Sequence, residues 1–97
     1  MPTYVTLLKW TDQGIRNVKE TVSRGQQFRQ MVEQAGGRLT TLYWTQGAYD
    51  IMAALECPDE DAAMALLLRL GMLGNVRSET LRAFSEQDMQ RILQKLP

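Results

Sequence analysis

The 97-residue chain contains no histidine and only one cysteine, Cys57. Histidine is the commonest metal ligand in proteins and a frequent general base, and most transition-metal and haem sites are built from histidine or several cysteines. A lone cysteine also excludes a disulfide within the chain. We therefore expect no metal site and no cofactor, and a reducing compartment, with the cytoplasm as the default location.

Long apolar runs and net charge are also lacking. No apolar stretch approaches the ~20 residues that span a bilayer, and the amino-terminal residues do not have the pattern of a signal peptide, so we expect no membrane association. Eleven basic and eleven acidic residues cancel and are interleaved, which provides no long-range field to attract nucleic acid. The length and the 44% hydrophobic content favour a single domain over residues 1–97.

The spacing of the apolar residues predicts seven elements. Period-two alternation and β-branched residues predict strands, which are Tyr4–Trp10, Leu39–Thr45, Tyr49–Glu56 and Val76–Phe84. Apolar residues that recur three or four positions apart predict helices. These helices are Ile15–Ala35, Ala62–Leu73 and a short final helix through Met89 and Leu96. We expect a kink or break near Gly25, an end to the second helix at Gly71 and Gly74, and a capping box at Ser85 and Asp88.

This order predicts an α+β fold, the ferredoxin-like βαββαβ arrangement with an extra carboxy-terminal helix and a four-stranded antiparallel sheet. Only Gln46–Ala48 separates the two middle strands, so they must form a hairpin. Both main helices then cover one face of the sheet. Both sets of alternating positions on the strands are substantially apolar, since Tyr4, Leu8 and Trp10 oppose Val5 and Leu7, although a face open to water is normally polar. A homodimer closed sheet on sheet explains this pattern.

Several motifs spread over nearly the whole chain resemble those of a known family. They are Tyr4–Trp10 with Thr11, Gly14-Ile15, Gly36-Gly37, Gly47–Asp50, Pro58-Asp59 and Leu70–Phe84. On these residues the chain resembles the GYD-domain proteins, with Ala48 standing between the glycine and the tyrosine of the motif that names the family. The resemblance implies the dimeric α/β-barrel build, in which ferredoxin-like subunits pair. It implies little about function, because the same fold hosts enzymes and sensor modules.

Two classes of function remain open. The first is a homo-oligomeric module that binds a small molecule or has a structural or regulatory role, with a small cavity near Tyr49, Asp50, Asn75 and Arg77. The alternative is a cofactor-independent enzyme of the dimeric-barrel type, an isomerase or monooxygenase acting on a small acid or an aromatic substrate. A weaker third idea is a scaffold that recruits an enzyme through the apolar helix Ala62–Leu73. The expected partners are other copies of the chain and a small-molecule ligand.

Tyr49 and Asp50 begin the third predicted strand, where a phenol and a carboxylate at the end of a sheet can orient a ligand by hydrogen bonds. A structural role is the commoner one for both residues, because an aspartate beside a glycine-containing turn commonly accepts from backbone N–H groups and a tyrosine often packs its ring while its hydroxyl finds a carbonyl. In the enzyme alternative, Asp50 or Glu79 is the proton acceptor.

A second polar series, Asn75, Arg77 and Glu79, lies at the start of the fourth strand. Arg77 is suited to bind a carboxylate or to stabilise an anion, and the same groups are suited to salt bridges between subunits. Trp10 and Trp44 complete the candidate site, since they offer a flat wall for a planar ligand, or else pack in the core. For Cys57 the expected role is a buried, inert thiol.

Overall fold

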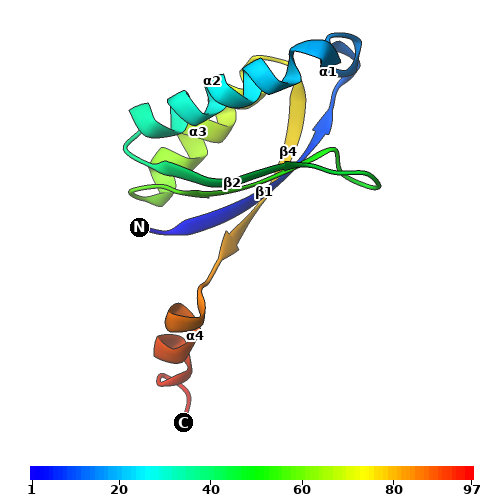
Figure 1. The fold of residues 1–97 in the computed structure, drawn as a ribbon. Helices are drawn as coiled ribbons and strands as arrows, with labels where there is room; N and C mark the ends of the chain where they lie inside the picture. The colour runs from blue at the N-terminus through cyan, green and yellow to red at the C-terminus, as the bar shows by residue number, and fades with distance from the viewer.

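A computed structural model describes all residues, 1–97, and its fold is the ferredoxin-like arrangement that the sequence predicts (Figure 1). The strands are β1 (Thr3–Trp10), β2 (Arg38–Trp44), β3 (Ile51–Glu56) and β4 (Val76–Ala83). The helices are α1 (Asp12–Arg16), α2 (Thr21–Gln34), α3 (Glu60–Met72) and α4 (Glu86–Leu93), with a 3₁₀ turn η1 (Val18–Glu20) between α1 and α2. No helix is long and apolar enough to cross a membrane.

The four strands form one antiparallel sheet in the order β2-β3-β1-β4. The two middle strands of the chain, β2 and β3, pair as the expected hairpin, with an irregularity between Leu39 and Thr41. Strands β1 and β4 pair along their full length, from Thr3 opposite Ala83 to Trp10 opposite Val76. Since neighbouring side chains along a strand point to opposite faces, this register decides which residues share a face of the sheet.

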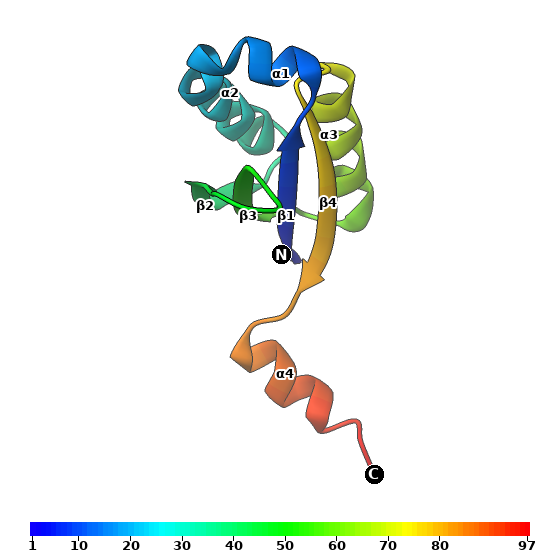
Figure 2. The ribbon, with the colours of Figure 1, turned by 90° about the vertical axis from the view of Figure 1, so that its right-hand side faces the viewer.

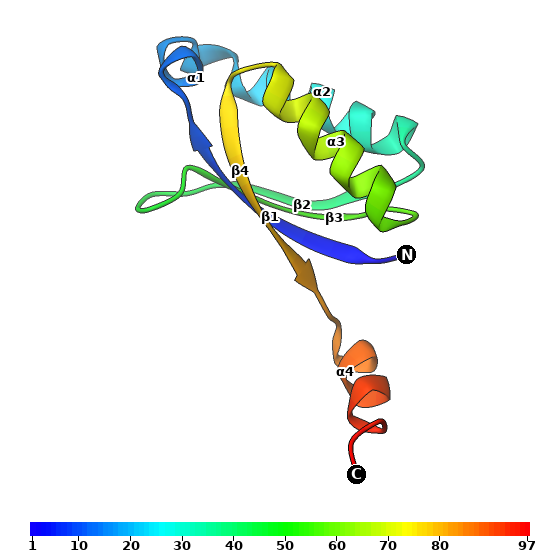
Figure 3. The same ribbon diagram turned by 180° about the vertical axis from the view of Figure 1, so that it is seen from behind.

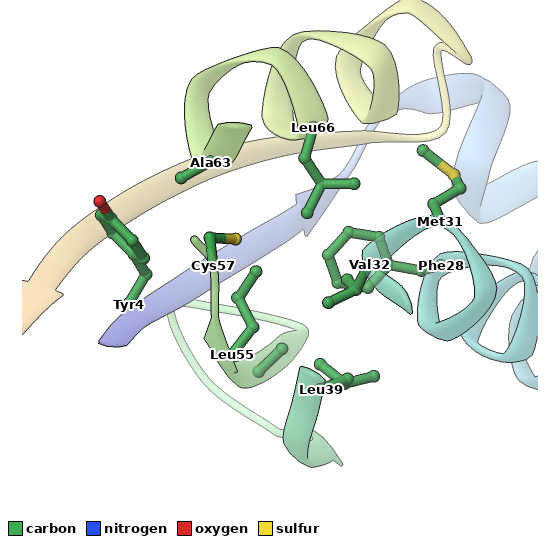
Figure 4. Packing of buried hydrophobic residues seen from close by; sticks show 10 residues of the cluster. Tyr4, Phe28, Met31, Val32, Leu39, Leu55, Cys57, Ala63 and Leu66 are labelled. Atoms are coloured by element: carbon green, nitrogen blue, oxygen red, sulfur yellow. The ribbon is translucent and has the colours of Figure 1, made fainter. Parts of the chain in front are cut away.

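Helices α2 and α3 cover one face of the sheet, and no helix covers the other (Figures 1 and 3). The hydrophobic core lies between the sheet and helices α2 and α3 (Figure 4). It consists mainly of Leu39 and Leu55 from the sheet and Phe28, Val32 and Leu66 from the helices. Only 15 of the 97 residues are buried, because a single layer of helices on a single sheet leaves half of the sheet exposed.

Helix α4 lies away from this two-layer body, beyond the sheet on the side opposite α2 and α3 (Figures 1 and 2). Ser85 caps it: the Ser85 hydroxyl accepts from the Asp88 N–H at 3.1 Å, and the Asp88 carboxylate accepts from the Ser85 N–H at 3.0 Å. This capping box is the one that the sequence predicts, and it stabilises the start of the helix. None of the residues of α4 is buried, so its position is not set by packing on its own subunit.

One expectation about the helices is wrong. The break in the first helical run lies at Asn17 and the η1 turn, not at Gly25, which sits inside α2. A side chain on Gly25 would meet Leu42 at 3.0 Å and Trp44 at 3.6 Å, so this glycine serves the close approach of α2 to β2. Helix α3 continues through Gly71 and ends at Met72, close to the predicted end at Leu73.

Candidate functional site

The alternation of side chains along the strands divides the predicted site residues between the two faces of the sheet. Trp10, Trp44 and Asn75 line a cavity on the helix-covered side. Tyr49 contacts Lys9 and Glu79 on the uncovered side. The sequence predicts a single cavity near Tyr49, Asp50, Asn75 and Arg77, and this prediction is wrong, because only Asn75 of the four belongs to the lining.

The helix-side cavity has a volume of about 420 Å³ and lies between the first half of α2, the end of α3 and the sheet. This size is within the range of ~300–1,000 Å³ that is usual for small-molecule sites. Trp10 at the end of β1 and Trp44 at the end of β2 bring the two indole rings of the chain into its wall. The Trp44 Nε1–H donates to the Thr21 hydroxyl at 2.9 Å, which fixes the orientation of this ring.

Only two charged residues, Arg24 and Glu20, belong to the lining. One guanidinium nitrogen of Arg24, Nη2, donates to the Glu20 carboxylate at 3.1 Å. The other nitrogen, Nη1, is shielded from solvent and has no hydrogen-bond partner. The Arg24 side chain is 21% exposed and that of Glu20 is 71% exposed. The cavity therefore has apolar walls and one cationic group with unused hydrogen-bonding capacity.

Arg24 is the residue of this site that the sequence analysis missed, because it counted the arginine among scattered surface charges. A signal was available in the spacing: Arg24 precedes the buried residues Phe28 and Met31 by four and seven positions, so it lies on the covered face of α2. Val22, although it is an apolar residue of the predicted helix Ile15–Ala35, lies just after the η1 turn and is 58% exposed.

On the uncovered face, the Tyr49 hydroxyl donates a hydrogen bond to Glu79 Oε2. This hydrogen bond and the charge of Glu79 raise the pKa of Tyr49 above its ordinary value of 10.0. The Lys9 ammonium lies 5.3 Å from the centre of the Tyr49 ring, within the range of cation–π interactions. Arg77, which stands opposite Lys9 in the β1–β4 register, forms no ion pair within the subunit. These four side chains make a polar cluster at one end of the face.

Asp50 belongs to neither group. Its Oδ2 accepts from the Trp10 N–H at 3.0 Å, and its own backbone N–H donates to the Leu8 carbonyl at 2.9 Å. The carboxylate therefore satisfies the backbone at the end of β1 and closes the loop before β3, which is the turn chemistry described above. It also holds Trp10 in position at the wall of the cavity.

The rest of the uncovered face is apolar along its centre. We refer to it as the open face, and its central residues are Val5, Leu7, Tyr43, Met52, Ala54 and Leu81. Leu81 and Tyr43 are exposed, and the polar cluster with Lys9 and Glu79 borders the strip at one end. An apolar centre with a charged rim is the usual composition of a protein–protein interface.

Cys57 is fully buried, as expected, and burial raises the pKa of its thiol. No group of three or more cysteine, aspartate or glutamate side chains is placed to hold a metal ion. The buried Tyr4 hydroxyl has no hydrogen-bond partner, and burial raises its pKa as well. These groups lie in the core, away from the lining of the cavity.

Known proteins resemble the chain in sequence and in fold. It is 29% identical over 90 residues, which are 92% of this chain and 95% of the other, to the "Glutamine synthetase and cystathionine beta-lyase binding protein" of Thermus thermophilus. The crystal structure of TTHA0845, also from Thermus thermophilus, has the same fold, with a TM-score of 0.57 and 22% identity over 88% of this chain and 95% of that one. The model of the GYD domain matches residues 4–93. The chain therefore belongs to the GYD-domain family.

Proposed function

We propose that the protein is a homo-oligomeric binding module, which joins with a second copy through its open face and regulates or scaffolds another protein, an enzyme, by binding it. The observation that carries this proposal is the open face itself, an apolar sheet surface without a covering layer. The relative named for binding two enzymes supports the class of partner.

The size of the open face suits pairing with a second copy. Four strands at about 4.8 Å spacing and eight residues at about 3.3 Å each give a flat area of roughly 500 Å² before side-chain relief is counted. A standard interface buries ~800 Å² of accessible surface on each partner. A two-fold pairing would bring the Leu7 and Leu81 strip of one copy onto that of the other, and Arg77, which forms no ion pair within the subunit, would then pair with an acidic side chain of the second copy at the rim.

Helix α4 supplies the remaining contact. Its apolar side chains recur at steps of three and four, at Met89, Ile92 and Leu93, which makes one apolar stripe, and the exposed Leu96 follows just beyond the end of the helix. Phe84, just before the helix, is also exposed. Because α4 extends beyond the open face (Figure 2), this stripe meets the second copy when the two faces close. An isolated helix of eight residues is marginal in water, so such packing is what would stabilise it.

The outer side of α3 is the surface that we assign to the partner enzyme. Met64, Leu68 and Met72 follow one another at steps of four and are all more than half exposed, so they form a ridge on the side of the molecule opposite the open face. Flexible methionine side chains adapt well to a partner surface. Self-association and partner binding therefore use separate surfaces, and both can take place at once.

The enzyme alternative has less support. The cavity gives it a place for a substrate, but the two proposed proton acceptors lie outside the lining. Asp50 bonds the backbone of Trp10, and Glu79 bonds Tyr49. Glu20, the one carboxylate in the lining, is largely exposed and paired with Arg24. We therefore favour binding over catalysis.

Oligomer mass tests the first half of the proposal. Native mass spectrometry at micromolar concentration should give a species of at least twice the 11.1 kDa of the chain. Leu81→Arg, which places a charge in the open face, should shift the wild-type oligomer to monomer. Met64→Arg adds the same charge on α3 and should leave the mass unchanged. A monomeric wild type would contradict the proposal.

Binding to purified enzymes tests the second half. Glutamine synthetase and cystathionine β-lyase, immobilised for biolayer interferometry, are the probes, because the relative is named for them. The wild type should bind at least one of them, Met64→Arg should bind at least tenfold more weakly, and Thr40→Arg, an added charge on the edge strand β2, should bind normally. No binding of the wild type to either enzyme would refute this half and leave the oligomer standing.

A further inference from the structure

We infer that the helix-side cavity is a binding site for a small molecule that has an apolar body and a single carboxylate, which is held by Arg24. This site goes beyond the proposed function, because it lies on the covered side of the sheet and shares no residue with the open face or with the α3 ridge. The inference depends on the volume of the cavity, the composition of its walls and the unpaired Nη1 of Arg24.

The walls select an apolar ligand. Eleven of the 18 lining residues are hydrophobic, and the rings of Phe28, Trp10 and Trp44 are among them. A ligand with several charges would lose its hydration in such a site without compensation. A planar or branched hydrocarbon body of about ten heavy atoms is suited to a cavity of about 420 Å³.

Arg24 selects the carboxylate. Arg24 is the only cationic residue of the lining, and its Nη1 makes no hydrogen bond; a buried donor without a partner is unfavourable because its desolvation is not repaid. A carboxylate that enters beside Arg24 supplies the missing acceptor once a small turn of the side chain brings Nη1 to the cavity, and it forms a charge-assisted bond, which is stronger than a neutral one. The guanidinium is already oriented by its bond to Glu20 at 3.1 Å, so little side-chain order has to be gained on binding.

The neighbouring Glu20 limits the ligand to one negative charge. Arg24 and Glu20 together carry no net charge, so a phosphate or a dicarboxylate would find one cation and one repelling carboxylate. The same Glu20 can accept from an ammonium group. Both a free monocarboxylic acid and an apolar α-amino acid therefore have the required chemistry, and the test below distinguishes them.

Intrinsic fluorescence reports on this site directly, because the only two tryptophans of the chain, Trp10 and Trp44, both line it. The probes are 3-phenylpropanoate, phenylalanine and 2-phenylethylamine, which share the ring but differ in their charged groups. We expect a saturable change with at least one of the two carboxylates below millimolar concentration and none with the amine.

The variants identify the charged partner. Arg24→Gln should weaken binding of the carboxylate at least about tenfold, the usual effect of losing a charge-assisted hydrogen bond. The control Arg16→Gln removes the same charge from exposed α1 and should bind as the wild type does. If Arg24→Gln does not fold, Arg24→Lys keeps the charge but loses the planar fork, and it should also bind more weakly.

Glu20→Gln decides between the two ligand sources. Tighter binding of phenylalanine than of 3-phenylpropanoate to the wild type, with that preference lost in this variant, assigns an amino acid; tighter binding of 3-phenylpropanoate to the wild type, unchanged or increased in this variant, assigns a free acid. The inference is overturned if neither carboxylate gives a saturable change, if the amine binds equally well, or if the affinity is the same in Arg24→Gln. Arg24→Gln should keep the oligomer mass of the wild type, because Arg24 lies outside the open face. Loss of the ligand site and loss of the oligomer can therefore be told apart.

Discussion

Replacing Gly14 by alanine should destabilise the fold, although alanine is the better helix former. Gly14 is buried in the first turn of α1, and a Cβ on it would lie 2.0 Å from the carbonyl oxygen of Asn75. The oxygen belongs to the backbone and the Cβ is bonded directly to Cα, so neither atom can rotate away as the end of a long side chain would. Helix α1 and the segment before β4 must separate by about an ångström or more to remove this overlap.

The size of the effect follows from the bonds that hold these two segments together. The Thr11 N–H donates to the Asn75 carbonyl at 3.1 Å, and the Thr11 hydroxyl donates to the Gly74 carbonyl at 2.6 Å. Losing both costs about 2 kcal/mol, and disturbing the cap that Thr11 provides costs about 1 kcal/mol more. The helix preference of alanine offsets about 0.5–1 kcal/mol. The net loss is about 2 kcal/mol, or roughly 8–16 °C in Tm for a domain of this size.

Gly71→Ala is the matched control. Gly71 lies in α3, a Cβ added to it would have no neighbour within 4 Å, and its φ is not positive, so alanine there should raise the free energy of unfolding by about 0.5–1 kcal/mol. Thermal unfolding followed by circular dichroism should thus show opposite shifts for the same substitution. Protein concentration must be equal in all samples, because an oligomer has a concentration-dependent Tm. A Tm of Gly14→Ala within about 2 °C of the wild type would refute the reasoning.

Three further outcomes are expected. The pKa of Tyr49 is raised by its hydrogen bond to Glu79, so this bond stabilises the folded chain below pH ~10, and the stabilisation is lost as the pH rises through the pKa of Tyr49 in the folded state. In Glu79→Gln, the tyrosinate absorbance of Tyr49 should therefore appear at lower pH. An unchanged titration curve would mean that the bond does not form. The Cys57 thiol is fully buried with a raised pKa, so Ellman's reagent should react with it slowly in the native protein and rapidly in urea; fast native reaction would contradict its placement. Ser85→Ala removes the cap of α4, worth ~1 kcal/mol, and should speed amide exchange in α4 with little change in the body, whereas equal acceleration in β1 would show that α4 is part of the cooperative core.

The fold could be predicted because local signals and overall topology agree. Alternating runs marked the strands, the short loop around Gly47 forced a hairpin, and the Ser85 capping box started the last helix. The break at η1 was missed since Val18 and Val22 keep a helical spacing across it. Periodicity alone cannot distinguish one continuous helix from two helices whose spacing happens to match.

The candidate site was harder to predict because it depends on which face each residue occupies. Tyr49 and Asn75 both lie beside strand ends, yet one is bonded on the open face and the other lines the cavity. Without the register between β1 and β4, the sequence cannot place such residues together or apart. Arg24 was overlooked for a different reason: a charge on a helix is usually solvated, and only tertiary packing buries its Nη1.

The separation of α4 from the body has a consequence for how its sequence can change. Folding of the subunit places no demand on Met89 or Leu93, since no residue of α4 is buried. In a library of single variants scored by the yield of folded subunit, aspartate at either position should be as frequent as at an exposed site. When the same library is scored by the yield of oligomer, the aspartate variants should be absent from the oligomeric fraction. The difference between the two scores would map, residue by residue, the part of this chain that is selected for contacts with other molecules.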